Sequence, residues 1–217
     1  MNRKRLILLV SMLVCSIAVS AQPYERMVRN SLWSASDNVA GIRQDTVSAS
    51  YAELYAGYEG GEFRDTWQAE EGWSAGAATA SIRHLERLSL KGSFSFEQTE
   101  GYGMCGSMFI DPGFYPVDVL EFTPGRKSLQ TYAFDGGFSY DLTSEWRIGA
   151  AMDFTSANMA KRKDLRHTNW KLDMTVAPGF MYHSGDFAIG GSYIFRKTSE
   201  SIKAEQVGTS ESSYYAF

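Results

Sequence analysis

Hydrophobic and polar residues alternate along most of the chain, most clearly in residues 131–154. Tyr132, Phe134 and Phe138 are separated by small or polar residues, and after a short polar break the alternation resumes at Trp146. A side-chain period of two is typical of a β-strand with two different faces. The pattern predicts strands over about residues 46–59, 72–83, 88–97, 130–142, 146–155, 170–182 and 187–195, and an eighth that begins at Ser212.

The lengths of these segments and of their connections favour one architecture. The clearest segments run for about 10 to 14 residues, whereas strands of globular proteins average about 5 to 6 and tilted membrane strands need about 9 to 11. Short connections are predicted near residues 84–86, 141–145 and 183–186, and long ones near 60–71, 99–128, 156–168 and 198–210. We therefore predict an all-β fold, an antiparallel up-and-down transmembrane β-barrel with about seven to eight strands present.

Aromatic residues mark both borders of the apolar face. Tyr140 and Trp146 flank a short turn, while Tyr132 and Phe154 lie at the far ends of the same strands. Two such girdles are expected where amphipathic rings meet the lipid–water boundary. Alternation alone also fits a soluble sandwich or a lipocalin-like barrel.

The opposite face carries charges of both signs and is predicted to line the lumen: Lys91, Glu97, Asp135, Arg147, Asp153, Lys171 and Asp173. Mixed signs favour paired groups that fill a narrow barrel over a charge-selective pore. On this assignment, Phe134→Asp should impair membrane assembly, and Ser139→Asp should be tolerated.

The first residues have the features of an export signal. A basic Arg3-Lys4-Arg5 precedes an apolar run that is too short for a membrane helix, and small residues lead to Ala21. The predicted organisation is a signal peptide at 1–21, an N-terminal periplasmic segment at 22–45 and an outer-membrane barrel at 46–217. After cleavage only Cys105 remains, so no disulfide within the chain is expected.

Charge narrows the classes of partner. The chain has 21 basic and 25 acidic residues, a formal net charge of −4. Nucleic-acid binding requires a basic surface, so no nucleic-acid partner is expected. The expected partners are outer-membrane lipid and, through the loops, lipopolysaccharide or another envelope protein.

Three stretches carry a resemblance to a known family: "SLWSASDNVAGI" (residues 31–42), "FIDPGFYPVD" (109–118) and residues 161–195, with "KRKDLRHTNW" and "VAPGFMYHSG". They resemble an uncharacterised Bacteroidetes-type outer-membrane β-barrel family, domain of unknown function 6850. Leu165 stands where the family pattern has proline. The resemblance implies a longer barrel, so this chain is expected to hold its N-terminal part; alternatively, Phe217 is a terminal aromatic assembly signal.

Few residues suggest chemistry. His84 and His183 are predicted at short turns and His167 in a long loop, so they would not share one site. No Gly-x-Ser-x-Gly turn between a strand and a helix is predicted. We expect no catalytic residues, cofactor or metal. The basic run Lys161, Arg162, Lys163 and Arg166 is predicted in an outward loop, where it either holds lipopolysaccharide phosphates or is simply a solvated charged loop.

Three functions are compatible with these features. The first is a transport or uptake-accessory barrel of unknown substrate. The second is a plugged structural barrel that binds a partner through its outer loops, of which the aromatic-rich 99–128 is the most prominent. The third, least supported, is an outer-membrane hydrolase.

Overall fold

The structure is a computed structural model that describes residues 36, 38–44, 48–65, 68–207 and 214–216. The predicted signal peptide at 1–21 lies outside these residues. The elements are a 3-10 helix, η1 (Val39–Gln44), and the strands β1 (Ala49–Gly60), β2 (Glu71–His84), β3 (Leu88–Ser107), β4 (Val119–Asp141), β5 (Trp146–Lys161), β6 (Arg166–Ser184), β7 (Phe187–Ser192), β8 (Phe195–Glu205) and β9 (Tyr214–Ala216).

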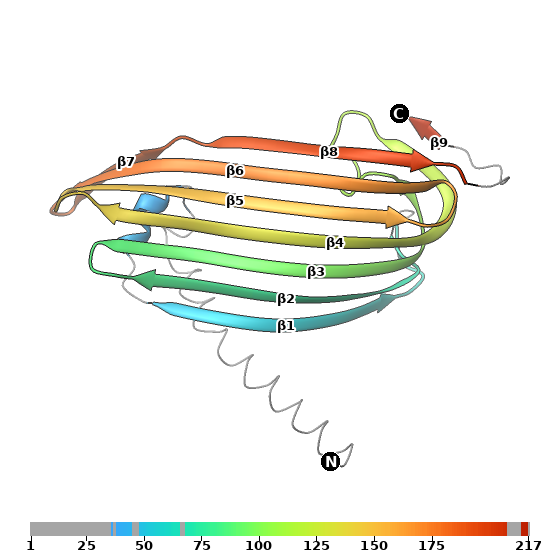
Figure 1. Ribbon diagram of the computed structural model, residues 1–217, viewed down its shortest axis with the longest axis horizontal. Coiled ribbons are helices and arrows are strands. Elements are labelled where there is room, and N and C mark those ends of the chain that lie inside the picture. Colours follow the sequence, from blue (N-terminus) through green and yellow to red (C-terminus); the bar gives the residue numbers. More distant parts are fainter. Residues whose placement is uncertain (1–35, 37, 45–47, 66–67, 208–213, 217) are drawn as a thin grey trace, which may run out of the picture.

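One antiparallel up-and-down sheet contains all the described strands, which confirms the all-β prediction (Figure 1). From β1 to β7 each strand pairs with the next in sequence. β8 also pairs with β6, and it keeps the register of β7, from Gly179↔Ser192 to Val176↔Phe195. The break falls opposite Pro178, which has no backbone N–H to donate to the ladder. β7 and β8 are therefore one strand that proline interrupts.

The predicted eighth strand does not extend the sheet beyond β8. β9 instead pairs with Val119–Glu121 at the start of β4. Among the described residues, β1 and β8 therefore each have a neighbour on one side only, and the sheet is open.

The short connections are confirmed, but three of the four predicted long ones are not. β3 runs to Ser107 and β4 begins at Val119, so the predicted loop 99–128 shrinks to residues 108–118. The loop 156–168 shrinks to 162–165, and β8 occupies most of 198–210. The β3–β4 ladder shifts register between Gly101 and Gly106, and such irregularities erase the alternation that would have revealed the strands. Only the connection at 61–70 has the predicted length.

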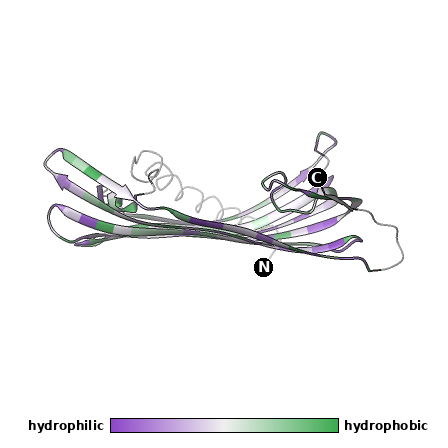
Figure 2. Cartoon of the chain, turned by 90° about the horizontal axis from the view of Figure 1, so that it is seen from above, coloured by the Kyte–Doolittle hydropathy of each residue, from purple (hydrophilic) through white to green (hydrophobic). Residues whose placement is uncertain are grey.

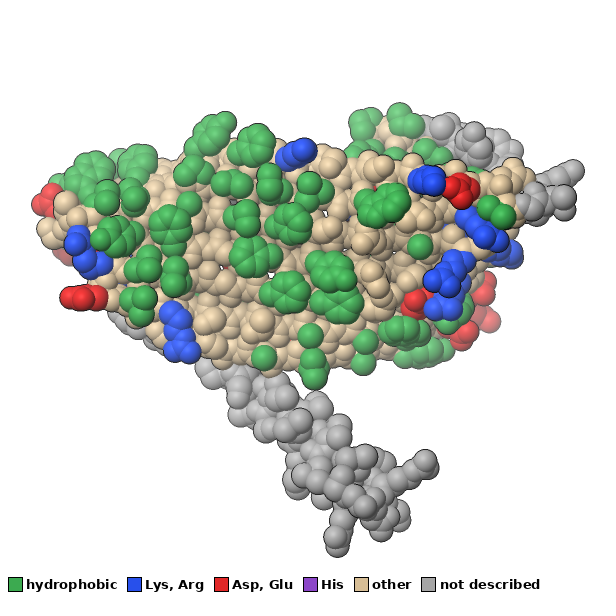
Figure 3. All heavy atoms as spheres, in the orientation of Figure 1, with side chains coloured by type: hydrophobic (Ala, Val, Ile, Leu, Met, Phe, Trp, Pro, Cys, Tyr) green, Lys and Arg blue, Asp and Glu red, His purple; other side chains and the backbone are tan. Residues whose placement is uncertain are grey.

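The sheet is curved, and its two sides differ (Figure 2). η1 and the β3–β4 connection lie on the inner, concave side, at opposite ends of the strands (Figures 1 and 2). Val39 and Ile42 of η1 pack with Ile82, Ala151 and Ala177 in a small apolar cluster on that side. On the outer side, apolar side chains are spread across the middle of the strands, and charged side chains gather toward the ends (Figure 3).

Among the described residues, no helix combines the length and the apolar character needed to cross a membrane.

Candidate functional site

The seven charges predicted to line a lumen lie on one face of the sheet. In an antiparallel pair, directly opposite residues share a face. Across the strand pairs, Asp135 lies opposite Asp153, Lys91 opposite Gly137, and Arg147 opposite Asp141. The same reasoning through β5 and β6 places Lys171 and Asp173 on this inner face, and alternation along β3 adds Glu97.

Most of these charges have partners of opposite sign. Lys91 Nζ lies 3.3 Å from Asp135 Oδ2, and Arg147 Nε lies 2.7 Å from Asp141 Oδ1. Lys171 pairs with Asp111 of the β3–β4 connection, and Asp173 lies 2.6 Å from Arg196 Nη2. The inner face is therefore a set of ion pairs, as the mixed signs indicated.

Residues 38–44 cover the inner face at the short-turn end. The Asn38 Nδ2 group donates to the Phe180 carbonyl at 2.9 Å, and its Oδ1 accepts from the Ala40 N–H at 3.2 Å. The Ala40 carbonyl accepts from Ser139 Oγ at 3.0 Å. A Cβ added to Gly179 would lie 2.4 Å from Asn38 Oδ1, so glycine is what allows the segment to approach this closely.

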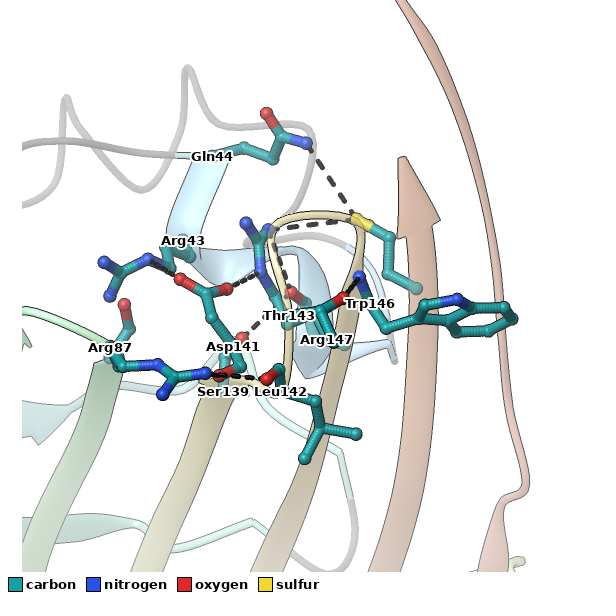
Figure 4. Close-up of polar contacts among 12 residues, drawn as sticks. Arg43, Gln44, Arg87, Ser139, Asp141, Leu142, Thr143, Trp146 and Arg147 are labelled. Carbon is teal, nitrogen blue, oxygen red and sulfur yellow. Dashed lines mark hydrogen bonds and ion pairs between the residues drawn. The ribbon is translucent and has the colours of Figure 1, made fainter. Parts of the chain in front are cut away.

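Charged contacts fix the same end of the sheet (Figure 4). Asp141 accepts ion pairs from Arg147 and from Arg43 of η1. Arg43 and Arg87 also donate to backbone carbonyls of the neighbouring turns. Ser139 is wholly buried beneath η1, so the expectation that Ser139→Asp is tolerated is wrong. A carboxylate there would face the Ala40 carbonyl without water.

The β3–β4 connection covers the inner face at the other end. Asn169 Nδ2 donates to the Met108 carbonyl at 2.6 Å, and the Ile110 N–H donates to Glu200 Oε1 at 2.9 Å. With the Lys171–Asp111 pair, these contacts join the connection to β6 and β8. A cavity of about 400 Å³ lies under it, lined mainly by apolar side chains such as Met104, Phe109 and Met159 with the Lys127 amine beside them.

Lys161 does not belong to the outward basic group that the sequence predicted. It ends β5, faces inward and forms an ion pair with Glu121, which also lies 3.6 Å from Lys127 Nζ. The Lys161 and Glu121 side chains are 0% and 1% exposed, so this contact is structural rather than a lipopolysaccharide contact. Burial lowers the pKa of Lys127.

His167 is likewise in β6 and buried, not in a solvated loop. Its Nδ1 lies 2.7 Å from Asn169 Oδ1, while the buried Nε2 has no hydrogen-bond partner among the residues that the structure describes. Burial, opposed only in part by that hydrogen bond, lowers the pKa of His167 to about 4. The ring is therefore neutral near pH 7. His84 ends β2 and His183 is the penultimate residue of β6, both at the opposite, short-turn side.

Arg162, Lys163 and Arg166 do come together, in and beside the β5–β6 connection. With Thr123, Asp164 and Arg126, they line a cavity of about 460 Å³. Arg126 was not singled out in the sequence, because it lay within the stretch read as a loop. Its Nε is 2.6 Å from Glu100 Oε2, and this hydrogen bond holds the pKa of Glu100 below its usual range.

No group of three or more His, Cys, Asp or Glu side chains within the described ranges is arranged to hold a metal ion. The site features are thus a two-faced sheet, two segments covering its polar face and a basic cluster beside its apolar face. They define a class of β-sheet protein with one apolar and one polar face. A family model described as "Family of unknown function (DUF6850)" matches residues 39–217, and the chain belongs to this family. No curated protein matches the chain. Nor does any solved structure.

Proposed function

We propose that this sheet forms part of the wall of an outer-membrane β-barrel in a Gram-negative bacterium of the Bacteroidetes type. The chain would be exported through a signal peptide at residues 1–21. The observation that carries the proposal is the large apolar face that no described segment covers. Exposed apolar side chains gather there from every central strand, among them Phe94, Phe134, Phe138, Met152 and Phe180. A contiguous apolar patch of this size is expected only against lipid or a partner.

The dimensions of that face support lipid. It extends from Tyr140 to Tyr132 on β4 and from Leu88 to Phe96 on β3. Eight residue steps at about 3.3 Å each span about 26 Å along the strands, comparable to the apolar band of outer-membrane barrels. Aromatic pairs stand at both borders, Trp146–Tyr182 at 5.0 Å and Phe96–Tyr132 at 4.9 Å between ring centroids.

In hydrocarbon, the open edges at β1 and β8 would leave backbone N–H and C=O groups unpaired, at several kcal/mol each. The membrane form therefore requires further strand pairing at both edges, which closes a barrel around the polar face. That face, with Lys91, Asp135 and Asp173, becomes the inner wall.

Within this barrel, we favour a transport or uptake-accessory role without chemistry. Between η1 and the β3–β4 connection, the inner face is lined by small polar side chains such as Ser93, Ser95 and Thr175, which suit a hydrated path. A plugged structural or partner-binding barrel is the second candidate. It is favoured by the ion pairs on the inner face and by the segments that cover it at both ends.

Planar-bilayer conductance of the purified full chain separates the two candidates. A transport barrel should give discrete conductance steps, and Asp153→Lys on the inner face should shift ion selectivity toward anions. Ser156→Lys, on the outer face above the apolar band, is the matched control and should not. Folded, membrane-inserted protein that shows no conductance would support the plugged barrel instead.

Membrane residence is tested separately by washing envelopes with alkaline carbonate. Protein that leaves the membrane in this wash and stays monomeric without detergent would refute the barrel itself.

A further inference from the structure

We propose that the basic cluster Arg126, Arg162, Lys163 and Arg166 binds the phosphate groups of a lipopolysaccharide-type glycolipid packed against the outer face of the sheet. This inference rests on the proposed membrane location and names a specific lipid partner for it. Four cationic residues, from the β5–β6 connection and from strands β4 and β6, line one cavity of about 460 Å³.

Arg126 and Arg166 of the cluster lie on the same side as the apolar face. Lys127 and Lys161 are opposite each other and face inward, so Arg126, one residue earlier on β4, points outward. Arg126 indeed contacts the outward residues Glu100 and Tyr102, the latter at 5.6 Å from its ring centroid. His167 is buried on the inner side, which places Arg166 outward on β6. Basic side chains gather at this end of the outer face in Figure 3.

The cluster carries excess positive charge that its neighbours do not neutralise. Arg126 pairs with Glu100, and Arg166 pairs with Asp164 at 3.1 Å. Within the described part of the chain, neither Arg162 nor Lys163 forms an ion pair. Arg126 and Arg166 remain half-exposed despite their partners. Guanidinium groups held in place by a carboxylate can still donate their other N–H groups to a phosphate, in paired hydrogen bonds.

A strip of amide and hydroxyl side chains, here called the amide strip, separates the apolar side chains of the outer face (the apolar band) from the basic cluster. Outward positions between them carry amides and hydroxyls: Gln98, Ser128, Gln130, Ser156 and Asn158. Gln98 Nε2 already donates to Ser128 Oγ at 2.9 Å, so the strip is a connected hydrogen-bonding surface.

The order of the three zones matches one class of molecule. The distance along the strand from the border of the apolar face to the basic cluster is four residues, or about 13 Å, on β6 (Trp170 to Arg166). On β4 it is six residues, or about 20 Å (Tyr132 to Arg126). Strand tilt shortens both heights. A phosphorylated glycolipid of the outer leaflet would place its acyl chains on the apolar band, its sugars on the amide strip and its phosphates at the arginines. A soluble phosphorylated ligand would not use the first two zones.

The test uses the full chain purified in a mild detergent, with binding followed by native mass spectrometry and by calorimetry. The probes are a bis-phosphorylated acylated diglucosamine lipid, the same lipid after phosphatase treatment, and inorganic phosphate. We expect wild-type protein to bind the phosphorylated lipid at least tenfold more tightly than the dephosphorylated lipid.

Two variants give the matched comparison. Arg126→Gln/Arg162→Gln/Arg166→Gln should weaken binding of the phosphorylated lipid at least tenfold, to the level of the dephosphorylated lipid. Arg83→Gln makes the same kind of change at an exposed outward position at the other end of the strands and should leave binding unchanged. The retained fold is checked by far-ultraviolet circular dichroism and by the electrophoretic shift on heating.

Equal binding of the two lipids by wild-type protein would overturn the inference, and because this comparison needs no variant it stands even if the triple variant does not fold. Binding of inorganic phosphate alone, without the lipid, would overturn it in favour of a soluble anion. A chain that inserts into bilayers but binds no phosphorylated lipid refutes this inference and leaves the barrel intact, whereas a chain that does not insert refutes the proposed function.

Discussion

Replacing Phe94 by lysine tests which solvent the apolar face meets. Phe94 is 46% exposed on that face, opposite Phe134 on β4. A Phe side chain presents about 200 Å², so about 90 Å² would touch hydrocarbon and contribute about 2 kcal/mol. A lysine in the membrane interior costs a further 2 to 4 kcal/mol or so at the midplane and less toward the borders.

Together these terms predict that Phe94→Lys destabilises the membrane-inserted form by about 4 kcal/mol, roughly a thousandfold in the assembly equilibrium. The matched control is Ser95→Lys, one residue away on the inner face. Glu97 and Asp135 share that face, so the new ammonium has water and carboxylates nearby. We expect a change within about 1 kcal/mol.

The assay is urea unfolding of the full chain in lipid vesicles, followed by tryptophan fluorescence and the electrophoretic shift on heating. Equal destabilisation by the two lysines, or a neutral Phe94→Lys, would refute the lipid-facing assignment. If the apolar face instead packed against a soluble partner, Phe94→Lys would leave membrane assembly intact and abolish that partner's binding.

Three further predictions concern buried groups on the inner side of the sheet. His167 has a pKa of about 4 in the folded state and about 6.5 in the unfolded state, so the unfolded state binds more protons between these pH values. The free energy of unfolding should therefore fall by up to about 3 kcal/mol as the pH drops from 6.5 to 4. His167→Gln should remove this pH dependence in urea titrations. Glu121→Gln would leave Lys127 and Lys161 buried without a counter-charge, and should lower the free energy of unfolding by about 3 to 5 kcal/mol in the same titrations. Adding Lys161→Met should restore part of this stability. An unchanged stability in Glu121→Gln would contradict the buried ion pairs. A Cβ at residue 137 would lie 2.8 Å from Val39 Cγ2, so Gly137→Val should displace η1 and speed amide hydrogen exchange at residues 38–44. Gly136→Val, on the outer face, should not change this exchange. Equal exchange rates in the two variants would show that η1 does not depend on this contact.

The faces of the sheet could be predicted from sequence because they are a local property. A strand alternates its side chains whatever it pairs with, so the parity of Lys91, Asp135 and Asp173 placed them together before any strand order was known. The short turns were equally local. Gly185, with φ of 59°, begins a two-residue turn between β6 and β7 that glycine adopts without steric cost.

The ends of the long strands could not be read in this way. Near Gly101 and Gly106 the ladder shifts register, and beyond the apolar band the outer face becomes polar, so polar residues occupy both faces. The hydrophobic period then vanishes although the backbone continues to pair. This is why Lys161 and His167 were assigned to a solvated loop, and why Arg126 was not recognised beside Arg162.

Local patterns were enough to predict the class of structure, long antiparallel strands with one apolar and one polar face, because alternation and turn residues act over a few positions. The segments that cover the polar face and the pairing of its charges depend instead on how the strands assemble. The ion pair of Lys161 with Glu121, the contact of Ser139 with Ala40 and the meeting of Arg126 with Arg166 each join residues far apart in the chain. Such partners are selected by register and by the path of connections, and no short stretch of sequence contains that information.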